Sequence, residues 1–141
     1  MSLNNLLIVT SSIISSQEIK ELLESFFVEN NPQRPDNENV LDFSLQVPLP
    51  TENINDIEQS KAEHWGTGKN CWNSKIRTKS DKEIVYEFTT QYTIPSLWLI
   101  SISLKYSKLE FSLTWFNKDD SGTLIVKNGV TTWGNGFHYS L

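Results

Sequence analysis

The chain has 141 residues, of which 38% are hydrophobic and 11% aromatic, so residues 1–141 fit a single domain whose core needs no disulfide or metal. Its net charge of −5 disfavours non-specific binding to phosphate backbones, and its single cysteine excludes an intrachain disulfide. No apolar run approaches the roughly 20 residues that cross a bilayer, and no signal peptide is recognisable, so we expect a cytoplasmic protein without a membrane partner.

A strand and a helix are the first predicted elements. The branched apolar run Asn5–Ser11 indicates a buried strand. In the segment "SSQEIKELLESFF" that follows, apolar residues recur from Ile19 at the spacing of one helix face. Ser15 and Glu18 fit a capping box at its start, so we expect a helix here.

The next segment alternates in the manner of a half-buried strand. Val40–Val47 follows a loop at Glu29–Asn39 and places apolar residues at every second position. The prolines of Pro48–Pro50 end the predicted strand. A long connection, Thr51–Cys71, comes next and carries only a weak helical signal. Connections of this length in compact domains are usually functional or partly ordered.

A second strong strand prediction covers Glu83–Tyr92, where Ile84, Tyr86 and Phe88 are expected to face the core. The segment after it gives conflicting signals. Alternation over Ile100–Ser107 slightly favours a strand, whereas a proline shortly before it fits the first turn of a helix.

The last part of the chain predicts strands. Lys108–Phe116 alternates cleanly, Asn117–Gly122 is a turn, and Thr123–Gly134 is expected to form a hairpin. Asn128-Gly129 supplies the positive φ angles that a type I′ turn requires. The expected core unit is therefore about residues 5–116, followed by the hairpin at about residues 123–134.

Three segments resemble successive parts of the YubB-like ferredoxin-like domain family, which occurs largely in plasmid and phage proteins of unknown function. They are "LDFSLQVPLP", "HWGTGKNCWN" with its Trp-Gly-Thr element, and "FTTQYTIPSLWLISISLKYSKLEFSLTW". The resemblance covers Asn5 to Gly122. It implies an α+β fold with a ferredoxin-like βαββαβ arrangement and an antiparallel sheet, to which the hairpin is added. It also implies that Ile94–Tyr106 is a helix. In this chain the loop is longer, with "GKNC" between Thr67 and Trp72.

The loop "HWGTGKNCW" holds the candidate site. A Cys71 nucleophile with His64 as base, a metal site that adds His138, and a phosphate-binding loop all lack partners or spacing, so we expect no catalytic residue, metal or cofactor. The favoured interpretation is that the tryptophans anchor the loop. The alternative is that aromatic and cationic side chains face a partner. The candidate binding residues are Trp65, Gly66, Thr67, Lys69 and Trp72.

A small non-enzymatic binding or regulatory protein of mobile-element type, acting through protein–protein contact, is the function we expect. One alternative is single-stranded nucleic-acid binding, although the basic cluster of Lys75, Arg77, Lys79 and Lys82 is better explained as a solvated strand edge or loop. Another is an enzyme or small-ligand binder that uses the His64–Cys71 loop. A homodimer through a sheet edge is also open, because the hairpin can either cover an edge or pair with a second chain.

Overall fold

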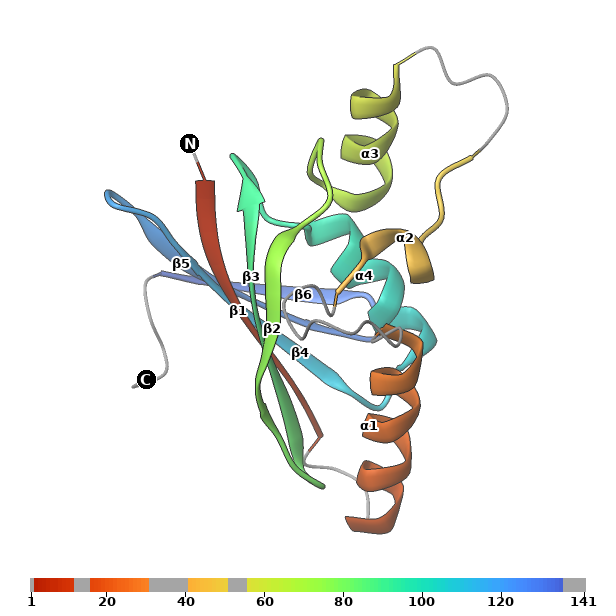
Figure 1. Cartoon of the computed structure of the whole chain (residues 1–141). Helices are drawn as coiled ribbons and strands as arrows, with labels where there is room; N and C mark the ends of the chain where they lie inside the picture. The colour runs from red at the N-terminus through yellow and green to blue at the C-terminus, as the bar shows by residue number, and fades with distance from the viewer. Residues whose placement is uncertain (1, 12–15, 31–40, 51–55, 136–141) are drawn as a thin grey trace.

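The computed structural model describes residues 2–11, 16–30, 41–50 and 56–135. This part of the chain contains four helices and a six-stranded antiparallel sheet, so the expected α+β class is confirmed (Figure 1). The helices are α1 (Ser16–Asn30), α2 (Phe43–Gln46), α3 (Ile57–Trp65) and α4 (Ser96–Lys105). The strands are β1 (Ser2–Thr10), β2 (Trp72–Lys79), β3 (Glu83–Gln91), β4 (Glu110–Phe116), β5 (Ser121–Lys127) and β6 (Val130–Asn135).

The strand order across the sheet is β2-β3-β1-β4-β5-β6, and every neighbouring pair is antiparallel. β1 is central: its Leu7 lies opposite Tyr86 of β3 on one side and Leu113 of β4 on the other. Residues that lie directly opposite each other share a face of the sheet. Helices α1 and α4 cover the face that carries Leu7, and we call the opposite face, which none of the described helices covers, the open face (Figure 1).

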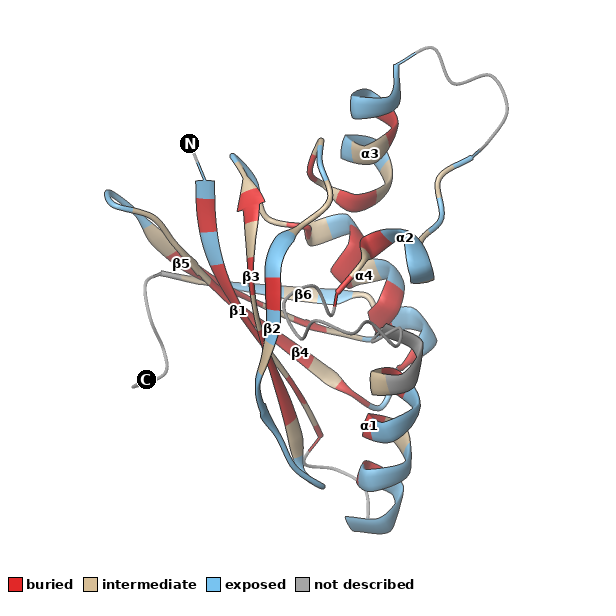
Figure 2. Cartoon of the chain, viewed as in Figure 1, coloured by how far each residue is buried: buried red, intermediate tan, exposed pale blue. Residues whose placement is uncertain are grey.

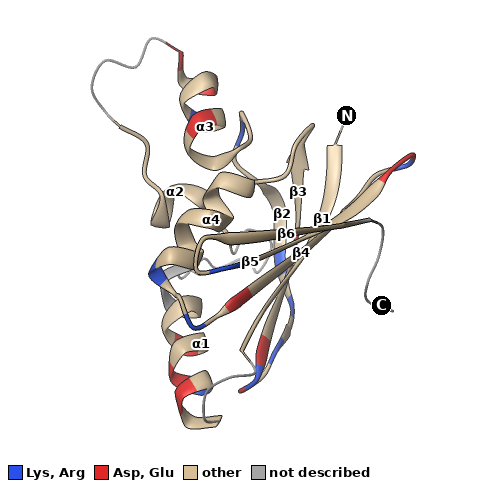
Figure 3. Ribbon diagram, turned by 180° about the vertical axis from the view of Figure 1, so that it is seen from behind, with Lys and Arg blue, Asp and Glu red and all other residues tan. Residues whose placement is uncertain are grey.

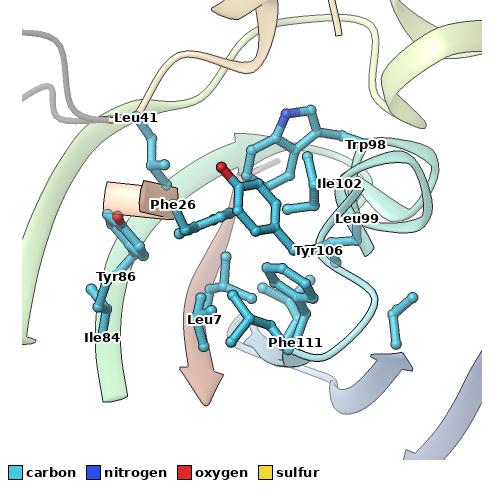
Figure 4. Close-up of a cluster of buried hydrophobic side chains, with 14 of the residues drawn as sticks. Leu7, Phe26, Leu41, Ile84, Tyr86, Trp98, Leu99, Ile102, Tyr106 and Phe111 are labelled. Atoms are coloured by element: carbon cyan, nitrogen blue, oxygen red, sulfur yellow. The ribbon is translucent and has the colours of Figure 1, made fainter. Parts of the chain in front are cut away.

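The hydrophobic core lies between this sheet face and the helices. Figure 2 shows buried residues along the central strands and on the sheet-facing sides of the helices. Phe26 of α1 is central to it, with its ring centroid 6.1 Å from that of Tyr86 and 5.4 Å from those of Tyr106 and Phe111 (Figure 4). The expectation that Ile84, Tyr86 and Phe88 face the core is confirmed, since each is at most 1% exposed.

Two sequence predictions in the middle of the chain are wrong. Val40–Val47 is not a strand, because its described part contains the short helix α2, which begins after Asp42. The Asp42 carboxylate accepts a hydrogen bond from the backbone N–H of Ser44 at 3.0 Å and so caps the helix. Alternation was misleading here because Phe43 is buried while Leu45 is 45% exposed.

The second error is the omission of β2 from the sequence prediction. This strand is an edge strand with mostly exposed residues, and its pairing with β3 contains two register shifts. Edge position and bulges remove the regular alternation by which a half-buried strand is recognised.

The helix expected at Ile94–Tyr106 is confirmed as α4, which spans Ser96–Lys105. Its strand-like alternation has a physical explanation in Ser103, which is fully buried on the core side. The Ser103 hydroxyl donates to the carbonyl of Ile100 at 2.8 Å and accepts from the backbone N–H of Gly129 at 2.9 Å. A polar residue thus occupies a position where helical periodicity requires an apolar one.

The other predicted elements are also present. β1, α1, β3 and β4 match four of the predictions, with ends shifted by a few residues, although Ser15 of the expected capping box lies outside the described residues. β5 and β6 form the predicted hairpin, and its turn has positive φ angles of 47° at Asn128 and 78° at Gly129. No helix among the described residues is long and apolar enough to span a membrane.

Candidate functional site

Trp65 lies inside the protein at the end of α3. Its side chain is 2% exposed, and its indole N–H donates a hydrogen bond of 2.7 Å to the carbonyl of Val47. Its ring meets that of Phe43 edge-on, with centroids 5.8 Å apart. The residue therefore ties α3 to the segment that follows α2, and it is not available to a partner.

Gly66 and Thr67 join α3 to the neighbouring elements. Gly66 ends α3 with a φ of 88°, and a Cβ atom there would lie 2.9 Å from Ser96 Oγ and 3.0 Å from Ser96 N at the start of α4. Its carbonyl accepts a hydrogen bond of 2.8 Å from the hydroxyl of Thr93. The hydroxyl of Thr67, a residue that is 1% exposed, donates to the carbonyl of Gln91 at 3.4 Å. The Trp-Gly-Thr element therefore has a structural role: it connects α3 to the end of β3 and the start of α4.

The two remaining candidates lie at the surface. Lys69 is exposed, and Trp72 is 36% exposed at the first position of β2. Between them, Asn70 orders the longer loop. Its Oδ1 accepts hydrogen bonds from the backbone N–H groups of Phe43 at 3.1 Å and Cys71 at 2.9 Å. Asn70 was not among the residues that the sequence indicated, because an asparagine in a polar loop carries no distinguishing signal.

His64 and Cys71 are each held by a different backbone carbonyl. His64 Nδ1 lies 2.8 Å from the carbonyl oxygen of Ser60, one turn earlier in α3. Cys71 Sγ donates to the carbonyl of Leu41 at 3.6 Å. The described residues include no group of three or more His, Cys, Asp or Glu side chains that could hold a metal ion, and His138 lies outside them.

Trp72 begins a row of side chains across the open face. It lies opposite Thr89 of β3, which lies opposite Asn4 of β1, which in turn lies opposite Phe116 of β4. Strands in a sheet are about 4.8 Å apart, so the two aromatic residues are separated by about 14 Å. The sequence could not indicate this row, because it depends on the register of four strands.

A cavity of about 330 Å³ adjoins the row, and Asn4, Thr89 and Phe116 are part of its lining. Glu87 in its wall lies between two cations, with Lys75 Nζ at 3.1 Å and Arg77 Nη1 at 3.7 Å from its carboxylate oxygens.

These cations belong to the expected basic cluster and lie on the edge strand β2 (Figure 3). The side chains of Lys75 and Arg77 are 60% and 49% exposed. Lys79 of the same strand is turned to the helix side, where its ammonium lies 3.0 Å from the carboxylate of Glu24.

Comparison with known proteins gives one structural likeness. No family model and no curated protein sequence matches the chain. A crystal structure of the protein api92 from Yersinia pseudotuberculosis, described by the family DUF1281, matches with a TM-score of 0.55 at 10% identity. The match covers 74% of this chain and 35% of that one, so the matched part of this chain spans about a third of the length of the Yersinia protein. At this identity the chain is similar to the Yersinia protein in fold alone.

Proposed function

We propose that this chain is a small non-enzymatic binding or regulatory protein of mobile-element type, and that it contacts a protein partner through the open face around Trp72. The observation that carries the proposal is the different environment of the two loop tryptophans. Trp65 is fixed inside the protein, whereas Trp72 is 36% exposed and lies opposite Thr89, a residue that lines the cavity. Exposed tryptophans in a formed surface are the residues that most often dominate protein interfaces.

The electrostatics of this surface favour a protein over a nucleic acid. Glu87 neutralises one of the two positive charges at the cavity, and the whole chain carries a charge of −5. Affinity for a phosphate backbone depends on the number of unpaired Lys and Arg side chains that reach it. A mixed surface with a Trp side chain, one net positive charge and neutral amides is better matched to a polypeptide.

We also propose that β1, α1, β2, β3, α4 and β4 form a ferredoxin-like βαββαβ unit, and that the chain is related to the YubB-like family. Two observations support this relationship: the strand order β2-β3-β1-β4, and the structural contacts made by Trp65, Gly66 and Thr67. The proposed activity needs no cofactor, because it consists of surface contact.

Affinity capture from the natural host, followed by quantitative mass spectrometry, tests the protein-binding proposal. Trp72→Ala should lose the captured partner while its far-UV circular dichroism stays unchanged. Ile57→Ala is the matched control, because it truncates an apolar side chain that is 57% exposed on α3. Capture that is equal for the wild type and Trp72→Ala would show that the open face is not the contact surface.

A second candidate function is single-stranded nucleic-acid binding at the same cavity. Phe116 offers a ring for stacking, and Lys75 with Arg77 offers cations for phosphate. Against it, Tyr86 and Phe88 are in the core, so β1 and β3 contribute no ring to the open face. Filter binding to single-stranded RNA and DNA at low salt decides the matter: submicromolar, salt-sensitive binding that Arg77→Gln weakens would displace the protein-partner proposal.

A further inference from the structure

The two edges of the sheet differ in how well they are protected from another strand. β2 carries Lys75, Arg77 and Lys79, and its pairing with β3 has two register shifts. Charges and bulges are the usual features that prevent an edge strand from pairing with another chain. β6 pairs with β5 in continuous register, and its sequence, Val130–Asn135, contains no charged residue. Among the described residues, the β6 edge alone therefore has the properties of a pairing surface.

Large apolar side chains are exposed around this β6 edge. Val130 and Trp133 are 69% and 60% exposed, and Leu104 at the end of α4 is 59% exposed. Trp133 lies opposite the buried Leu124, so it points to the helix-covered face but beyond the cover that α4 gives to β5. Leu104 is near the hairpin turn, because a Cβ atom on Gly129 would lie 2.8 Å from Leu104 Cδ2.

We propose that β6 pairs with β6 of a second copy of this chain, antiparallel and around a two-fold axis. Lys127 and Val130 flank a two-residue turn, which makes them a hydrogen-bonded pair within the hairpin. Alternation then directs the backbone N–H and C=O groups of Thr131 and Trp133 away from β5. A two-fold axis at Thr132 brings Thr131 of each copy opposite Trp133 of the other, so these outward groups pair. The sheets join, and the exposed indoles lie between the two α4 helices.

Charge favours a second copy over an unrelated strand. The turn end of the hairpin carries Lys127, and Lys105 directly follows Leu104, the residue that lies near the turn at Gly129. The other end of β5 follows the turn that contains Asp119 and Asp120, whose charges outweigh that of Lys118. Antiparallel pairing directs the basic end of each copy toward the acidic end of the other. The charges of one copy are therefore complementary to those of a second copy of the same chain.

Sedimentation equilibrium over a dilution series tests the proposal with the full chain. The mass should rise from 16.2 kDa toward twice that value as the protein concentration increases. Thr131→Pro removes one outward N–H and leaves the pairing with β5 intact, and Trp133→Lys places a charge at the interface. Each should raise the dissociation constant of the dimer by at least about tenfold. Ile57→Lys, which places a charge at an apolar side chain that is 57% exposed on α3, is the matched control and should leave the dissociation constant unchanged.

Two results would overturn the proposal. One is a wild-type chain that remains monomeric across the whole dilution series, which would leave the edge to a different partner or to none. The other is a dimer that Trp133→Lys does not weaken, which would place the interface elsewhere. Trp133 has an exposed side chain, so its variant should fold as the wild type does, and far-UV circular dichroism verifies this even if Thr131→Pro disturbs the hairpin.

Discussion

Replacement of Trp65 by alanine should remove a large part of the folding free energy. A buried tryptophan removes roughly 150–250 Å² from water, which at about 25 cal/mol per Å² is about 4–6 kcal/mol. Measured losses for Trp→Ala in cores are about 3–5 kcal/mol. The hydrogen bond from the indole to the carbonyl of Val47 is broken as well. Since domains are stable by only about 5–15 kcal/mol, we expect a loss of about 4 kcal/mol.

Trp65→Phe separates the ring from the hydrogen bond. It keeps most of the apolar contact with Phe43 but leaves the carbonyl of Val47 without its indole donor, for an expected loss of about 2 kcal/mol. Trp72→Ala is the matched control in the same segment. Because Trp72 is 36% exposed on an edge strand, its loss should be near 1 kcal/mol.

Urea unfolding followed by far-UV circular dichroism measures these differences without depending on tryptophan emission. With a urea dependence of about 2 kcal/mol per M, Trp65→Ala should lower the midpoint by about 2 M, and Trp72→Ala by about 0.5 M. Equal midpoint shifts for the two alanine variants would refute the reasoning, since it rests on the difference in their burial.

Four further substitutions have defined outcomes. Gly66→Ala should lower the unfolding free energy by about 2 kcal/mol because of its positive φ and its contact with α4. Gly68→Ala, with its nearest atom at 3.7 Å, should stay within about 0.5 kcal/mol in the same urea assay, and equal losses would contradict this. Gly122→Ala should cost about 1–3 kcal/mol and alter the near-UV circular dichroism, since its Cβ would lie 2.5 Å from the Trp115 ring; an unchanged spectrum would count against it. Burial raises the pKa of Tyr86, and its hydroxyl has no hydrogen-bond partner in the described structure. The neutral phenol therefore stabilises the fold at every pH below the unfolded pKa of about 10. This contribution is lost as the pH rises above that value, because the unfolded chain then releases the proton more easily than the folded one. Tyr86→Phe should lose less stability than the wild type between about pH 8 and pH 11, and identical losses would exclude Tyr86 as the cause.

The sequence correctly predicted the elements in which apolar side chains recur at the spacing of one buried face. β3, β4 and the hairpin of β5 and β6 are of this kind, as is α1. The prediction failed where contacts with distant residues decide which side chains of a segment are buried. α2 alternates like a strand because Phe43 packs against Trp65 and Trp98, which are far away in the sequence. β2 has no regular pattern because it lies at an edge and contains bulges.

The candidate site was predictable only in part. The sequence located the loop but could not decide which indole is buried, because the partner of Trp65 is a carbonyl 18 residues away. The row from Trp72 to Phe116 and its adjoining cavity bring together four strands, so they follow from strand register alone. Long-range register is the information that a single sequence does not provide.

The central place of β1 has a consequence for the order of folding. Leu7 pairs with Tyr86 and Leu113, so β1 is synthesised long before either of the strands that it joins. β2 with β3, and β4 with β5 and β6, are linked by short turns and can form early. The entropy of closing long loops delays the non-local pairs, and such topologies fold in milliseconds to seconds. We therefore expect two preformed hairpin units to assemble on β1 in the rate-limiting step, with the inner edges of β3 and β4 exposed to aggregation until then.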